Sequence, residues 1–203
     1  MPYNRANGVN YAHHYWDKVC HDGHVATAAG GDSVQAGLPL SKAKLTSDER
    51  DCTHSLSCCV GNQTATPSFT VPGLGGSLAI ALPGGGLNIP STYTGMYGQV
   101  NTPKLVELLK KFGAKTVGGE IRRCGLFTPA PWRQAVEADI RNLAAGDVLV
   151  YAKGTTPNSY AHMALIVASD GQIACYTRSR FGEDYTDVDL VSHPFVTLPK
   201  MPG

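Results

Sequence analysis

The spacing of apolar side chains predicts helices in the first two thirds of the chain. Apolar residues recur every three or four positions over 5–18, a period typical of an amphipathic helix. A short helix is predicted over 51–60. A longer helix is predicted to begin near Pro103 and end at Gly113, because proline favours the first turn of a helix and glycine follows the last. A further helical stretch is expected over 131–143.

The hydrophobic period changes in the last third of the chain. Segments 147–152 and 160–168 are rich in β-branched and apolar residues, and 173–177 follows the turn Asp170-Gly171. Short connections between these three segments predict antiparallel pairing. The order of elements therefore indicates an α+β protein, with N-terminal helices packed on a C-terminal antiparallel β-sheet.

The predicted turn also implies a register for the last two of these strands. If the two turn residues are the only unpaired ones, Ile166 lies opposite Cys175. The same register places Thr177 and Ser179 on the face of the sheet that carries His162.

A chain of 203 residues has the length of one compact domain, so 1–203 is expected to form a single unit. The chain holds 23 glycines and 13 prolines, which concentrate in an expected loop insertion over 61–98. Only 77–82 has the composition of a strand there. Two interpretations of the insertion stay open: it lines or covers a cleft, or it is surface decoration.

The charge balance excludes several classes of partner. Basic and acidic side chains number 17 and 16, a net charge of +1, so nucleic acid is not an expected partner. No apolar run approaches the roughly 20 residues of a membrane span, and the first residues lack the apolar stretch of a signal peptide. A soluble chain is expected, and export to a periplasm or cell wall stays open.

The six cysteines do not follow the pattern of a disulfide scaffold or a zinc module. No Cys-x-x-Cys pair occurs, and two of the cysteines are adjacent. Cys20-His21-x-x-His24 offers three donors, but no fourth ligand follows from its spacing. We therefore predict no metal and no cofactor.

Cys52 is the candidate nucleophile. It stands at the start of a predicted helix, with Asp51 as the expected N-cap. Backbone N–H groups and the helix dipole at this end favour a thiolate and can also hold a developing oxyanion. Leu56 and Cys59 share its helix face, so the thiol is expected to point towards the sheet.

His162 is the candidate base. It is the one titratable side chain in the otherwise small and apolar run 161–167, where a buried polar group needs a partner or a catalytic role. A core histidine satisfied by a hydrogen bond is the alternative. His54 lies about 200° around the helix from Cys52 and is not expected to reach it.

Several of these stretches together resemble a known family. Asp51-Cys52-Thr53 is followed by the strand 145–151, which begins Ala-Gly-Asp, and then by the His162 strand 161–167. This order resembles the papain-like cysteine amidases and peptidases of the NlpC type, and especially a related amidase domain family whose first helix is similar to 3–12. The resemblance implies a papain-like fold, a catalytic Cys52 and a His162 base, and leaves the segment between 60 and 145 unmatched.

In the resembled families a His, Asn or Gln on the next strand orients the base, and this sequence has none at the matching place. Thr177 is our choice for this third catalytic residue, with Ser179 or Tyr176 as alternatives if the hairpin contains a bulge. A Cys-His dyad assisted by a backbone carbonyl is equally compatible.

The chemistry implied is hydrolysis of an amide by a cysteine nucleophile. The resemblance points to peptide stems of peptidoglycan as substrate, and a toxin of this kind would have an immunity or inhibitor protein as partner. The alternatives are a protein-directed cysteine peptidase, deamidase or transglutaminase-like effector, or a non-catalytic binding module of the same fold.

Overall fold

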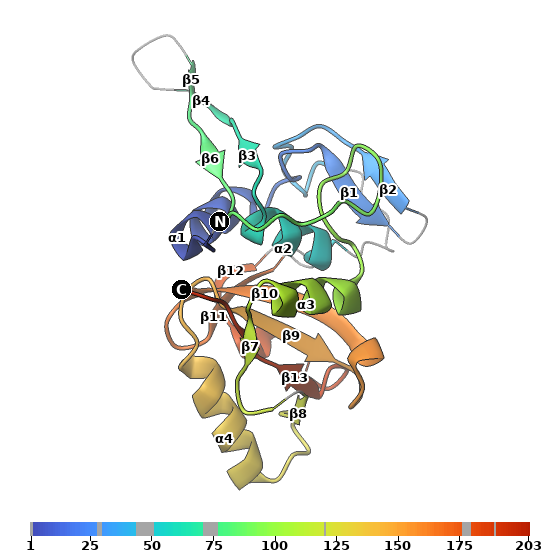
Figure 1. Ribbon diagram of the computed structural model, residues 1–203, viewed down its shortest axis with the longest axis vertical. Helices are drawn as coiled ribbons and strands as arrows, with labels where there is room; N and C mark the ends of the chain where they lie inside the picture. Colours follow the sequence, from blue (N-terminus) through green and yellow to red (C-terminus); the bar gives the residue numbers. More distant parts are fainter. Residues whose placement is uncertain are drawn as a thin grey trace.

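The computed structural model describes residues 2–27, 30–43, 51–70, 77–119, 121–175, 180–188 and 190–203 (Figure 1). It is a mixed α+β structure in three layers, with helices on both faces of a central antiparallel sheet. Within these ranges, no helix combines the length and the apolar composition needed to cross a membrane.

The helices are α1 (Arg5–Tyr15), α2 (Cys52–Val60), α3 (Thr102–Lys111) and α4 (Ala130–Arg141), with short 3₁₀ helices η1 (Pro157–Ser159) and η2 (Tyr185–Asp187). The central sheet has the strand order β12 (Arg180–Asp184), β11 (Gln172–Cys175), β10 (Tyr160–Ala168), β9 (Val148–Ala152), β13 (Phe195–Thr197) and β8 (Arg122–Arg123). Four two-stranded pairs lie outside it: β1 (His24–Thr27) with β2 (Gly30–Ser33), β3 (Thr64–Ala65) with β6 (Leu82–Pro83), β4 (Ser68–Thr70) with β5 (Ser77–Ala79), and β7 (Lys115–Thr116) with β14 (Pro199–Lys200).

Strand β9 is apolar throughout and β10 is apolar except for His162, because both faces of the sheet are covered. Val148 and Val150 of β9 join one core cluster with α1, α2 and α3, whereas Leu149 and Tyr151 join a second cluster with α4. The expected helices are present, as are the strands expected over 147–152 and 160–168 and the described part of the strand expected over 173–177. The burial of β10 on both faces confirms the prediction of a buried strand around His162.

The predicted hairpin register is wrong. Ile166 of β10 pairs with Ile173 of β11, not with Cys175, and Ala168 pairs with Gln172. The connection thus has three residues, including Asp170 and Gly171 at φ +67° and +76°, and a bulge shifts the pairing again between Ile166 and Ala168. The Asp170-Gly171 turn pattern alone does not show that the connection contains a third residue.

The Gly/Pro-rich segment 61–98 is more ordered than expected. Strands β3 to β6 form an arm that projects from the body on the side away from the central sheet (Figure 1). After the arm, Gly84, Gly85 and Gly86 run against the end of α2. A Cβ on Gly85 would lie 2.3 Å from the Tyr3 ring, so the backbone approaches too closely for any side chain.

The N-terminal helix is tied to the sheet by a buried ion pair. Arg5 Nη1 lies 2.7 Å from Asp147 Oδ1, and this carboxylate is inaccessible to solvent. Tyr3 Oη donates to Gly146 O at 2.9 Å, and Gly146 adopts φ +89° with Arg5 packed against its Cα. The Gly-Asp step before β9 therefore has a structural function, which is to anchor the start of α1.

Candidate active site

Cys52 is the first residue of α2, as the sequence predicts, and its side chain is almost completely buried. Asp51 is the N-cap residue, as expected, but its side chain makes no capping hydrogen bond. Its Oδ1 accepts instead from the backbone N–H of Ala26 at 2.6 Å and lies 2.9 Å from His54 Nδ1. Asp51 thus links the start of α2 to β1 and to His54 of the same helix. The Cys52 thiol lies at the N-terminal end of α2, where backbone N–H groups have no partner within the helix.

One cavity of ≈ 580 Å³ is lined by both Cys52 and His162. His162 lies near the start of β10, where its ring packs against the ring of Tyr151 with centroids 5.7 Å apart. His162 is only 6% exposed, and its Nε2 has no hydrogen-bond partner in the described part of the chain. The structure therefore brings the predicted nucleophile and base to the wall of one cavity, and leaves a ring nitrogen available for chemistry.

Two helix N-termini open into this cavity. Cys52 and Thr53 of α2 line it beside Asn101 and Thr102 of α3, and the hydroxyls of Thr53 and Thr102 lie 2.7 Å apart. Asn101 caps α3 by accepting from the Lys104 N–H at 3.0 Å. Since both helix ends carry partial positive charge, the cavity favours an anionic group.

Two basic side chains of the cavity wall were not among the sequence candidates. Lys153 follows β9, and His193 precedes β13. Among the described residues that line the cavity there is no Asp or Glu. Neither side chain stands in a recognisable motif, since both lie in connections whose position depends on the folded sheet. The third predicted catalytic residue, Thr177, and its alternatives Ser179 and Tyr176 lie outside the described residues.

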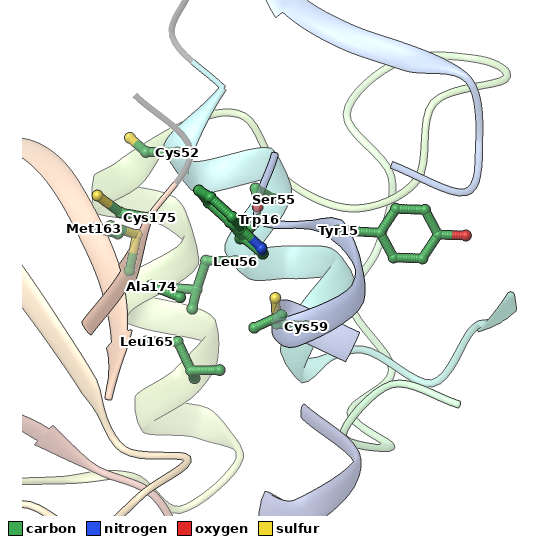
Figure 2. A pocket seen from close by; sticks show the side chains of 11 residues that line it. Tyr15, Trp16, Cys52, Ser55, Leu56, Cys59, Met163, Leu165, Ala174 and Cys175 are labelled. Atoms are coloured by element: carbon green, nitrogen blue, oxygen red, sulfur yellow. The ribbon is translucent and has the colours of Figure 1, made fainter. Parts of the chain in front are cut away.

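Cys52 also borders a much smaller pocket between the helices and the sheet (Figure 2). In this view Cys175 and Met163 lie on the same side as Cys52, while the Tyr15 ring points away. The pocket measures ≈ 10 Å³, which is about the space of one water molecule, so it is a packing gap and not a substrate site. No residue of 61–98 in the described chain lines either this pocket or the large cavity.

His54 does not belong to the cavity. It is completely buried on α2, with Nδ1 2.9 Å from Asp51 Oδ1 and Nε2 3.0 Å from Asp22 Oδ2. Burial alone lowers the pKa of His54, but the charge of Asp51, neighbouring Cys20 and the hydrogen bonds to both carboxylates outweigh it and hold that pKa well above its ordinary value. Burial conversely raises the pKa of Asp22, but the hydrogen bond to His54, its charge and the backbone N–H groups of Tyr97 and His24 together outweigh burial, and the net shift is downward. The two carboxylates that flank His54 therefore favour its protonated form.

Comparison of the chain with protein-family models, with curated proteins and with solved structures gave no match.

Proposed function

We propose that the protein is a cysteine amidase or peptidase that hydrolyses amide bonds, with Cys52 as nucleophile and His162 as base. The observation that carries the proposal is their position on one cavity: a thiol at a helix N-terminus, and an imidazole whose Nε2 has no partner among the described residues. A core histidine kept only for packing would have both ring nitrogens satisfied.

The mechanism requires one covalent intermediate. His162 takes the thiol proton, and Cys52 Sγ attacks the amide carbon. The first-turn N–H groups of α2 stabilise the oxyanion that forms. His162 then protonates the leaving amine, the C–N bond breaks and a thioester remains. Water, deprotonated by His162, hydrolyses the thioester, releases the carboxylic acid and restores the thiol. Thr177 orients His162 in this proposal.

The cavity favours a peptide that carries a carboxylate near the scissile bond. Lys153 and the two helix ends supply positive potential, and no acidic side chain opposes it in the described lining. Stem peptides of peptidoglycan have this chemistry, and the resemblance of the Asp51-Cys52-Thr53, 145–151 and 161–167 stretches to papain-like NlpC-type amidases supports the same substrate. We therefore infer that peptidoglycan stem peptides are the substrate and that the fold is papain-like.

Digestion of purified peptidoglycan tests the proposal. The parent protein should release new amino groups, and mass spectrometry of the products identifies the bond. Cys52→Ala and His162→Ala should each lower the rate at least about 100-fold. Cys124→Ala is the matched control, because this buried thiol lies in the core cluster that contains α4.

Retention of the rate in Cys52→Ala would overturn the chemistry. Absence of released amines from peptidoglycan, together with cleavage or deamidation of a protein substrate that depends on Cys52, would overturn the substrate and keep the nucleophile. Absence of both activities would favour a binding module.

A further inference from the structure

Three potential metal ligands converge away from the cavity. Cys20 follows α1 in the chain, and His54 and Cys58 stand one turn apart on α2. All three side chains are completely buried, and their donor atoms lie within 4.8 Å of one another. None of the three lines the cavity that holds Cys52.

The distance between Cys58 and His54 matches that between two ligands of a tetrahedral zinc ion. Cys58 Sγ lies 3.6 Å from His54 Nε2. Zinc–sulfur and zinc–nitrogen bonds of about 2.3 and 2.0–2.1 Å at a tetrahedral angle place sulfur and nitrogen about 3.5 Å apart. Asp22 Oδ2 lies at hydrogen-bond distance, 3.0 Å, from the same nitrogen and is our candidate for a fourth ligand.

The surrounding hydrogen bonds orient these groups. Asp51 holds the other ring nitrogen of His54, an arrangement that metal-binding histidines commonly share because it fixes the ring and its tautomer. Asp22 is fixed by the backbone N–H groups of His24 and Tyr97, at 3.1 and 2.7 Å. These contacts hold His54 and Asp22 in fixed orientations for binding a metal.

We propose that Cys20, Asp22, His54 and Cys58 form a structural site for a zinc-class divalent cation. The metal takes the place of the proton on His54 Nε2, and each cysteine loses its proton as its sulfur binds. The cation lies on the Asp22 side of the His54 ring, because Asp51 contacts the opposite ring nitrogen. A site closed by four protein ligands leaves no position for substrate, so its role is to fasten the segment after α1 to the helix that begins at Cys52.

Two arrangements compete with the metal. One is the metal-free ion pair of His54 with its two carboxylates. The other is a disulfide between Cys20 and Cys58, which are free thiols in the structure. His21 and His24 of the local pattern Cys20-His21-x-x-His24 are not among the residues of the described chain whose donor atoms converge with Cys20.

Metal analysis of the full-length protein tests the proposal. The protein is expressed in zinc-supplemented medium and purified without chelators. The number of zinc ions per chain is then measured by elemental mass spectrometry. We expect about one zinc ion in the parent protein and in the control Cys124→Ser, and less than a tenth of that in Cys58→Ser. Removal of zinc and titration with Co²⁺ should give thiolate-to-cobalt charge-transfer absorption and the visible bands of tetrahedral cobalt.

The cobalt titration uses only the parent protein, so it tests the proposal even if Cys58→Ser does not fold. Absence of zinc together with absence of these cobalt bands would overturn the proposal. So would equal metal content in Cys58→Ser, or a peptide map that shows Cys20 linked to Cys58 by a disulfide in the purified parent. Because zinc content is measured without substrate, failure of the amidase proposal would leave this result unaffected.

Discussion

Replacing Arg5 with alanine removes the cationic partner of a completely buried carboxylate. Arg5 Nη1 lies 2.7 Å from Asp147 Oδ1, and the guanidinium also donates to the carbonyls of Ala145 and Met201. In the variant Asp147 keeps only two backbone donors, the N–H groups of Ala144 and Met201. Breaking a buried ion pair in this way costs about 3–5 kcal/mol. The Arg5 side chain is 24% exposed, so water can partly replace it, and we expect about 3 kcal/mol.

Urea unfolding measures this loss. With an m-value of about 2 kcal/mol/M, a loss of about 3 kcal/mol lowers the midpoint by roughly 1.5 M, and Tm should fall by roughly 6–12 °C. Arg141→Ala is the matched control, because Arg141 is 41% exposed and pairs with the exposed Asp170, so its loss should cost about 1 kcal/mol or less. Equal midpoints for the two variants would refute the argument that the Gly-Asp step anchors α1.

Three further predictions concern the core, the cavity and the arm. Burial, with a smaller contribution from the charge of Glu137, raises the pKa of Cys124 from 9.0 to about 12, so the unfolded chain loses this proton first and stability falls as pH rises from 9 towards 12. Cys124→Val should make the decline of the unfolding free energy shallower by about 1.4 kcal/mol per pH unit above pH 9, and an unchanged slope in urea titrations would contradict this. Lys153→Gln should raise KM about tenfold for a peptide substrate with a free carboxylate and leave kcat little changed. Its KM for the matching amidated peptide should also change little. Steady-state kinetics on both peptides checks this, and an equal rise in KM for both would contradict a charge contact. Replacing 66–81 with a short glycine turn between Ala65 and Leu82 should change kcat/KM on soluble peptides less than about twofold, because no described residue of the arm lines the cavity. A tenfold loss of kcat/KM would show that the arm contributes to the active site.

The sequence predicts the elements that carry a long, regular pattern. Helix α3 has a proline start, a glycine stop and a continuous apolar stripe, and β9 and β10 are apolar on both faces because both faces are buried. The short strands β8 and β13 have two and three residues, too few to show a period of two, and they join the sheet through contacts with distant segments.

The candidate site was predictable only in part. Cys52 and His162 stand out because one begins a helix and the other interrupts an apolar strand. Lys153 and His193 carry no such local signal, because the folded sheet brings them to the cavity. The cluster of Cys20, His54 and Cys58 was not predicted for the same reason, because only the folded chain brings Cys20 next to Cys58. The local sequence pattern paired Cys20 with His21 and His24 instead.

The rate at which iodoacetamide modifies Cys52 at neutral pH is the most direct test of the catalytic pair. Peptide mass spectrometry follows the thiol in the parent protein, in His162→Ala and in the control His193→Ala, which alters the other histidine of the same cavity. We expect His162→Ala to lower the rate about tenfold or more, and His193→Ala to change it less than about twofold. Equal rates in the parent and His162→Ala, or a loss confined to His193→Ala, would contradict the assignment of His162 as the base for Cys52.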